Sequence, residues 1–233
     1  MKFTTPLIKG RLVERYKRFF ADIELDNGKI ITAHCANTGS MAGLKDPGNP
    51  VWVSPVDNPK RKLKYDWHMV EVGSALVGIH THAANKIVEE ALKENHIQEL
   101  LGYDSIRREV KYGQNSRIDF LLQDKDKPDC YVEIKSITYS RTKGLAEFPD
   151  SPTARGTKHL VELSHMAQDG ARAVMLYLVQ RADCNQFRIA DDIDPEYQST
   201  LIRAKQSGVE SLAYACALSP LEISLSHAIK SIE

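Results

Sequence analysis

The first third of the chain consists of short apolar stretches separated by clusters of Gly, Pro and Asn. Residues 7–35 have the pattern of β-structure, and Asp26-Asn27-Gly28 lies between two of the apolar runs. Asn-Gly at such a place predicts a hairpin, because the tight turns that join two strands need residues that tolerate positive φ. Further strands are predicted at residues 51–53, 69–72 and 75–77. About five short strands in this length favour a small closed β-barrel of the OB-fold type.

The spacing of the apolar residues changes to that of a helix at Ala83. The helix is expected to continue to Leu101 and to stop at Gly102. His80 and His82 stand just before it and have the chemistry of metal ligands, but no Asp or Cys is spaced to join them, so a structural role is expected. The apolar face of the helix is formed by Ala84, Ile87, Val88, Ala91 and Leu92.

A mixed pattern follows and predicts an αβ domain. Strands are expected at residues 106–112, 117–122 and 131–136, with a polar loop at 123–129. The later elements expected are a buried strand at 173–179, a helix at 195–206, a strand at 212–218 and an edge strand or tail at 223–229.

A long segment without regular apolar spacing lies between these elements. Residues 141–157 contain several Gly and Pro residues and are expected to form a loop, which at this length is usually functional. A helix should then open at residue 158, with Thr157 as its N-cap, and end near Gly170.

The composition is that of an ordinary globular protein. The 233 residues include 31 Lys and Arg and 31 Asp and Glu, and 42% of them are hydrophobic. No apolar run approaches the roughly 20 residues of a membrane-spanning helix, and the first residues lack the apolar core of a secretory signal. The four scattered cysteines form no CxxC pair. We therefore expect a cytoplasmic protein without a membrane partner.

The zero net charge conceals a difference between two parts of the chain. Residues 1–82 carry 12 basic and 8 acidic side chains, whereas residues 83–233 carry 19 and 23. Such an asymmetry indicates two modules with different tasks. We predict an OB-fold-like nucleic-acid-binding domain at 1–82 and an αβ domain at 83–233.

Two basic clusters with neighbouring aromatic residues lie in the first module. Cations pair with phosphates and aromatic rings stack on bases, so these clusters are typical of a groove for single-stranded nucleic acid. The alternative is a solvated strand face and a charged loop beside core aromatics. The first cluster contains Arg11, Arg15, Lys17 and Arg18 with Tyr16, Phe19 and Phe20, and the second contains Lys60, Arg61, Lys62 and Lys64 with Tyr65 and Trp67.

An acidic residue on one predicted strand, followed by Glu-x-Lys on the next, is the most informative pattern in the chain. Because side chains alternate along a strand, Glu133 and Lys135 share one face and Ile134 points into the core. Asp119 lies on the neighbouring strand between apolar residues. Two carboxylates, to which the Ile134 carbonyl could add a ligand, suit Mg²⁺ or Mn²⁺, and a lysine beside them can stabilise charge developing on a phosphate. This arrangement resembles that of PD-(D/E)xK nucleases, and the alternative is a solvated ion pair.

Further side chains are candidates to complete this centre. In the PD-(D/E)xK superfamily a first acidic residue often comes from the opening helix, and the spacing leaves Asn85, Glu89 and Glu90 as alternatives. His159 and Glu162, three residues apart on the next helix, share a face. They could line the metal site or position a phosphate, unless Glu162 faces solvent. The cations expected to meet phosphates in this region are Arg141, Lys143, Arg155 and Lys158.

Several segments together resemble the sugar fermentation stimulation protein A (SfsA) family of bacteria and archaea. They extend over nearly the whole chain, and one loop residue departs from the family pattern, with Ala36 where Pro is expected. The matching segments are Cys35-Ala36-Asn37-Thr38-Gly39-Ser40-Met41, Arg117-Ile118-Asp119-Phe120, Val132-Glu133-Ile134-Lys135-Ser136, Phe148-Pro149-Asp150 and Arg155-Gly156-Thr157-Lys158-His159-Leu160.

This resemblance implies an N-terminal OB-fold-like β-barrel and a C-terminal PD-(D/E)xK nuclease-like αβ domain. It also implies non-specific DNA binding and a regulatory link to sugar (maltose) metabolism. We expect a salt-sensitive DNA-binding protein with a divalent-metal-dependent nuclease centre, and dimers are common among nucleases of this fold. The alternatives are a DNA-binding regulatory factor without turnover and a small-molecule sensor, for which the sequence shows no sugar-site signature.

Overall fold

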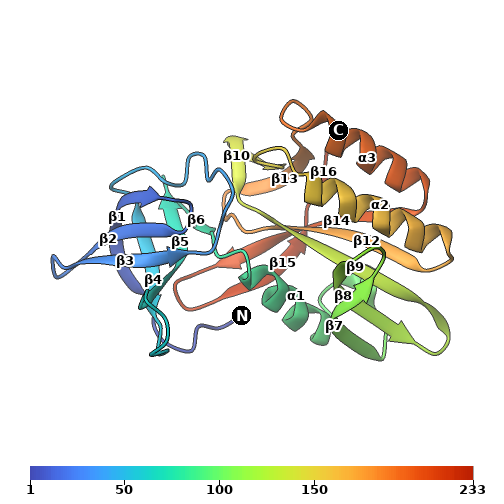
Figure 1. The fold of residues 1–233 in the computed structure, drawn as a ribbon, viewed down its shortest axis with the longest axis horizontal. Helices are drawn as coiled ribbons and strands as arrows, with labels where there is room; N and C mark the ends of the chain where they lie inside the picture. The colour runs from blue at the N-terminus through green and yellow to red at the C-terminus, as the bar shows by residue number, and fades with distance from the viewer. Residues whose placement is uncertain (233) are drawn as a thin grey trace.

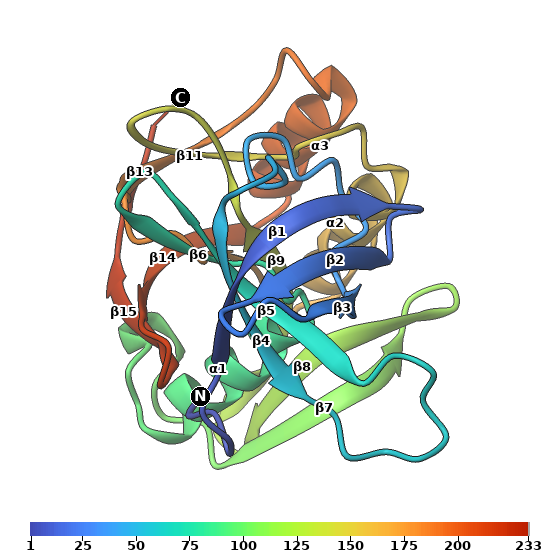
Figure 2. The same ribbon diagram turned by 90° about the vertical axis from the view of Figure 1, so that its left-hand side faces the viewer.

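The computed structural model describes residues 1–232. Its first part is a β-barrel with the strand order β3-β2-β1-β4-β5-β6, and a further pairing between β3 and β5 closes it (Figure 1 and Figure 2). The expected OB-type barrel is therefore confirmed. Its strands are β1 (Ile8–Tyr16), β2 (Phe20–Leu25), β3 (Ile30–Cys35), β4 (Pro50–Pro55), β5 (Tyr65–Val72) and β6 (Ala75–Gly78).

The hairpin turns of the barrel differ in part from the prediction. The β2–β3 hairpin lies where Asn27-Gly28 predicts it, but only Gly28 has positive φ (78°), so this is not the two-residue left-handed turn expected. The β1–β2 turn instead places Lys17 (φ 47°) and Arg18 (φ 64°) in the left-handed region. Neither residue is Gly or Asn, so no turn signal marks this break between the two strands.

The second part contains a mixed sheet with the strand order β15-β14-β12-β9-β8-β7. Helix α1 packs on one face of this sheet, and α2 and α3 pack on the other (Figure 1). The buried strand and the helix expected at 173–179 and 195–206 are confirmed. The elements are α1 (Ala83–Lys93), β7 (Ser105–Tyr112), β8 (Ser116–Asp124), β9 (Lys127–Ile137), α2 (Ala154–Gln168), β12 (Arg172–Val179), α3 (Pro195–Gln206), β14 (Val209–Leu218) and β15 (Ile223–Ala228).

A small third sheet has the order β10-β11-β13-β16 and corrects one loop prediction, and the mixed sheet corrects another. The loop expected at 141–157 contains strand structure, because this segment pairs in parallel with a strand that the sequence pattern does not reveal. The polar loop expected at 123–129 is a short turn between β8 and β9. The strands of the third sheet are β10 (Tyr139–Thr142), β11 (Gly144–Phe148), β13 (Cys184–Ile189) and β16 (Lys230–Ser231).

Helix α1 ends earlier than predicted. Asn95 adopts a left-handed conformation (φ 58°), and the next amide, of His96, donates to the Ala91 carbonyl at 2.8 Å. This is the Schellman arrangement, in which a left-handed residue turns the chain out of the helix. The apolar residues that suggested a continuation to Leu101 instead pack through a short 3₁₀ helix, η1 (Gln98–Leu100).

Helix α2 begins earlier than predicted. Its N-cap is Thr153 rather than Thr157, and the Thr153 side chain accepts a hydrogen bond from the Gly156 amide at 3.1 Å. Gly156 is within the first turn, where a Cβ atom would lie 3.0 Å from the Tyr197 ring. The glycine thus permits close packing of α2 on α3 and does not mark a loop.

The two parts of the chain are connected by shared packing. Trp52 and Met69 of the barrel belong to the same apolar cluster as α1. The Gly78 amide of β6 donates to the Gln180 carbonyl, and Asp150 accepts hydrogen bonds from Ser40 and Met41 of a barrel loop. The four cysteines are free and buried, and no helix within residues 1–232 is long and apolar enough to cross a membrane.

Candidate metal centre

Strands β8 and β9 bring Asp119, Glu133 and Lys135 together at the face of the sheet that α2 covers. The Lys135 ammonium donates to Glu133 Oε1 at 2.8 Å. The Ile134 amide donates to Asp119 Oδ2, also at 2.8 Å, which fixes one carboxylate against the backbone next to the other. The Ile134 side chain is buried in the core on the other face of the sheet, so only its backbone is available to the centre.

His159 of α2 completes this group. It is buried, its Nδ1 forms a hydrogen bond with Glu133 Oε1, and it lies 3.2 Å from the Lys135 ammonium. Its Nε2 lies 3.5 Å from Arg155 Nε. His159 therefore holds Glu133 in place from the helix side.

Burial and charge set the protonation of the two carboxylates. Burial, and next to it the negative charge of Glu133, raises the pKa of Asp119 to about 6. Burial would also raise the pKa of Glu133, but His159 and Lys135 outweigh it and lower this pKa. Two carboxylates so close in a poorly solvated place repel each other, and a bound cation would relieve the repulsion.

The available ligand atoms suit a hard divalent ion. Glu133 Oε2 is buried and has no hydrogen-bond partner among residues 1–232, which is the state of an oxygen that an ion would satisfy. No three His, Cys, Asp or Glu side chains converge in the described part of the chain to hold an ion by themselves. Mg²⁺ and Mn²⁺ accept one or two carboxylates and keep several waters, whereas structural zinc requires four protein ligands.

The opening helix contributes Asn85 and neither of its glutamates. Asn85 Nδ2 donates to Asp119 Oδ1 at 2.7 Å. Glu89 pairs with Lys93 and Arg108, and Glu90 pairs with the amino terminus of the chain. The residue of this helix that meets Asp119 is therefore an amide and not a carboxylate.

Glu162 lies apart from the carboxylate pair. It is buried, and its Oε1 accepts from the Gln114 amide at 3.1 Å in the turn between β7 and β8. Lys158, one turn earlier on α2, donates to the Gln114 carbonyl at 2.9 Å. The structure therefore places only His159 of the predicted helical pair at the centre.

A cavity of about 410 Å³ opens over the centre. Asp119, Glu133 and His159 line it, together with the cations Arg117, Arg155 and Lys158. Sequence reasoning missed Arg117, although the alternation along β8 places it on the same face as Asp119, two residues away.

Several cations predicted to contact nucleic acid are engaged by other groups. Arg15 donates to the carbonyls of Asn37 and Gly39 and supports a loop. Arg61 forms a two-point ion pair with Asp66 at 2.6 and 2.8 Å. The remaining predicted cations are exposed on the protein surface, and they are Lys17, Arg18, Lys60, Lys62, Lys143, Arg155 and Lys158.

Arg141 is likewise engaged, by Glu147 and Asp192. Glu147 is buried, and although burial would raise its pKa, Arg141 and Arg188 lower it to about 2. The charge of Arg141 is thus compensated within the protein, because its guanidinium secures the third sheet. It does not add to a positive surface as the sequence suggested.

These features define a class of protein: an OB-type barrel joined to an αβ domain in which Asp119, Glu133 and Lys135 lie together on neighbouring strands. Residues 13–79 match the family described as "SfsA N-terminal OB domain", and residues 82–222 match "Sugar fermentation stimulation protein RE domain". The chain belongs to the SfsA family of sugar fermentation stimulation proteins.

Individual relatives cover almost the whole chain. A sugar fermentation stimulation protein homolog of Maricaulis maris is 58% identical over 223 residues, which cover 96% of this chain and 95% of the relative. The homolog of Agrobacterium fabrum is 52% identical and covers 100% and 98%. The structure of Pyrococcus furiosus SfsA in complex with Ca²⁺ matches with a TM-score of 0.90 at 26% identity and covers 100% and 98%.

Proposed function

We propose that this protein binds DNA and cleaves its phosphodiester backbone with a divalent metal ion held by Asp119 and Glu133. The observation that carries the proposal is the buried Glu133 Oε2, which lacks a partner in the described residues and lies beside a second carboxylate and Lys135. The complex of the Pyrococcus furiosus relative with Ca²⁺ supports a divalent ion as ligand. Within this proposal, residues 1–82 bind nucleic acid and residues 83–233 carry the centre.

Each group around the centre has a task in such a reaction. A bound Mg²⁺ or Mn²⁺ would polarise a phosphate oxygen and lower the pKa of a bound water. The Lys135 ammonium is placed to orient a nucleophile and to stabilise negative charge on the phosphate. Arg117, Arg155 and Lys158 around the cavity would pair with the neighbouring phosphates.

Divalent ions should stabilise the folded protein. At a free Ca²⁺ or Mg²⁺ concentration of 100 times Kd, the gain is about 2.7 kcal/mol, or a rise in Tm of about 5–10 °C for a chain of this size. Thermal unfolding in EDTA and in each ion measures it. The Asp119→Ala/Glu133→Ala variant should lose the rise in Tm. The Asp129→Asn variant should keep it, since Asp129 is a half-buried carboxylate on β9, the strand of Glu133. An equal shift in the double variant would place the ion elsewhere.

DNA binding should depend steeply on salt, and the exposed lysines of the β4–β5 loop should contribute to this dependence. Lys60→Gln/Lys62→Gln should reduce the slope of log Kd against log salt concentration by about 1–2. Arg141→Gln should leave the slope unchanged, because Glu147 and Asp192 already compensate its charge. Fluorescence anisotropy with labelled DNA in EDTA measures both. An unchanged slope in the double lysine variant would exclude this loop from the interface.

A further inference from the structure

A row of aromatic and polar side chains crosses the outer face of the barrel. In the strand register Tyr16 of β1 is paired with Phe20 of β2, Phe20 with His34 of β3, and His34 with Asp66 of β5. Paired residues on neighbouring strands project from the same face, so the four side chains form one continuous row. The rings of Tyr16 and Phe20 are stacked, with centroids 5.4 Å apart and planes 13° from parallel.

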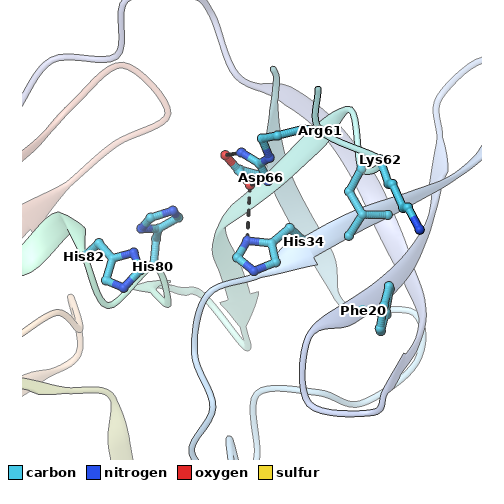
Figure 3. A pocket seen from close by; sticks show the side chains of 8 residues that line it. Phe20, His34, Arg61, Lys62, Asp66, His80 and His82 are labelled. Atoms are coloured by element: carbon cyan, nitrogen blue, oxygen red, sulfur yellow. Dashed lines mark hydrogen bonds and ion pairs between the residues drawn. The ribbon is translucent and has the colours of Figure 1, made fainter. Parts of the chain in front are cut away.

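A cavity of about 560 Å³ lies over Phe20, His34 and Asp66 of this row and reaches the connection between the two parts of the chain (Figure 3). Phe20 and His34 come from the barrel strands, Arg61 and Lys62 from the β4–β5 loop, and His80 and His82 from the connection. This volume is within the range of sites that hold one small organic group.

The polar groups of the cavity are held in place. Asp66 fixes Arg61 by two hydrogen bonds and lies 3.3 Å from His34 Nδ1. His80 Nδ1 is buried and has no partner within residues 1–232. Burial, more than any neighbouring charge, lowers the pKa of His80, so its ring is neutral at pH 7 and offers one donor and one acceptor.

Free cations flank the row at both sides. Lys17 and Arg18 are exposed in the β1–β2 turn, and Lys60 and Lys62 are exposed in the β4–β5 loop. Neither pair of residues has an acidic partner in the part of the chain that the structure describes. Aromatic rings between two groups of cations suit a single strand, whose bases can stack on the protein while its phosphates face the cations. A duplex cannot use the rings in this way, since its bases are stacked on one another.

We propose that this cavity binds an unpaired nucleotide, with the base against Phe20 and the backbone phosphates beside Lys62, so that single-stranded DNA is the preferred substrate class. The start of α1 connects this cavity to the metal centre. His82, which lines the cavity, is the N-cap of α1, and Asn85, one turn further, donates to Asp119. The substrate assignment rests on the nuclease function proposed above, whereas the binding site does not.

Binding to a labelled 12-nucleotide oligo-dT and to a 12-base-pair duplex, measured by anisotropy in EDTA, tests the site. Phe20→Ala should weaken single-strand binding by about 5- to 100-fold and duplex binding by much less. Lys62→Gln should weaken single-strand binding several-fold, and Lys29→Gln, an exposed lysine at the β2–β3 turn, should not. Equal losses on both DNAs, or no loss on the single strand, would overturn the proposal.

Phe20→Trp keeps an aromatic ring at the same position and is the second test variant if Phe20→Ala folds poorly. The two native tryptophans are buried, so emission from the new residue should be quenched by saturating oligo-dT and not by the duplex. Unchanged emission while anisotropy reports bound oligo-dT would show that no base reaches the row. These readouts need no cleavage, so an inactive metal centre would refute the nuclease function and leave the binding site standing.

Discussion

Glu133→Gln should reduce metal-dependent DNA cleavage by about 1000-fold, equivalent to about 4 kcal/mol of transition-state stabilisation. The substitution removes the negative charge that would hold the ion, and Gln keeps an oxygen that can accept from Lys135. It therefore tests the charge with little change in packing. The measurement is cleavage of labelled single-stranded, duplex and branched DNA with Mg²⁺ or Mn²⁺. Asp119→Ala/Glu133→Ala should be inactive on all three.

The matched control for this variant is Asp129→Asn, four residues earlier on β9. Asp129 accepts hydrogen bonds from Gln123 at 3.0 and 3.1 Å and does not contact the centre. Its substitution should leave cleavage within about 2-fold, as expected for surface changes away from the site. Cleavage that survives in both Glu133→Gln and the double alanine variant would refute the centre.

Absence of cleavage by the wild-type protein on every DNA form, with binding intact, would have a different meaning. The protein would then be a DNA-binding factor that retains the nuclease fold without turnover. The alternative of a regulatory role linked to sugar metabolism would become the leading hypothesis. The thermal shift with Ca²⁺ would still report whether the carboxylates hold an ion.

Lys135→Met should reduce the rate of cleavage by about 100- to 1000-fold, the effect of removing one preorganised donor from a developing charge. The ammonium lies in the centre with only 13% of its side chain exposed and touches both Glu133 and His159. Met has a similar length and no charge, so the ion site should persist. The Ca²⁺-induced rise in Tm should therefore remain while the single-turnover rate falls.

Lys127→Met is the control on the same strand. This lysine is exposed and donates to the Leu101 carbonyl at 3.1 Å, far along β9 from the centre. The Lys127→Met variant should cleave DNA at the wild-type rate. Lys135→Arg should restore little activity, because a planar guanidinium cannot replace a compact ammonium at such a site. A wild-type rate in Lys135→Met would assign its task to another cation, and Arg117 would be the first to examine.

The alternation of side chains along single strands was predictable from sequence. The period of two is a property of the extended backbone and does not depend on the rest of the fold. For this reason three predictions were correct: the common face of Glu133 and Lys135, the burial of Ile134 and the strand of Asp119. Helix α3 was also correct at both ends, because Pro195 begins it and Gly208 follows its last turn.

Features that depend on a distant partner were not predictable in this way. Strand β11 forms because β13, far along the chain, pairs with it. The end of α1 was missed because the apolar residues after it are buried by tertiary contacts and not by helical periodicity. The turn at Lys17 and Arg18 carries no local signal, and the pairing of β1 with β2 imposes it.

By itself, the sequence determined the barrel followed by an αβ domain, the neighbouring strands that carry Asp119, Glu133 and Lys135, and the family. Only the tertiary structure decided that Asn85, rather than Glu89 or Glu90, meets Asp119, because the rotation of a helix is set by what it packs against. It also decided which cations remain free. Asp66 and Glu147 compensate Arg61 and Arg141, and charge compensation depends on distances in space that residue order does not contain.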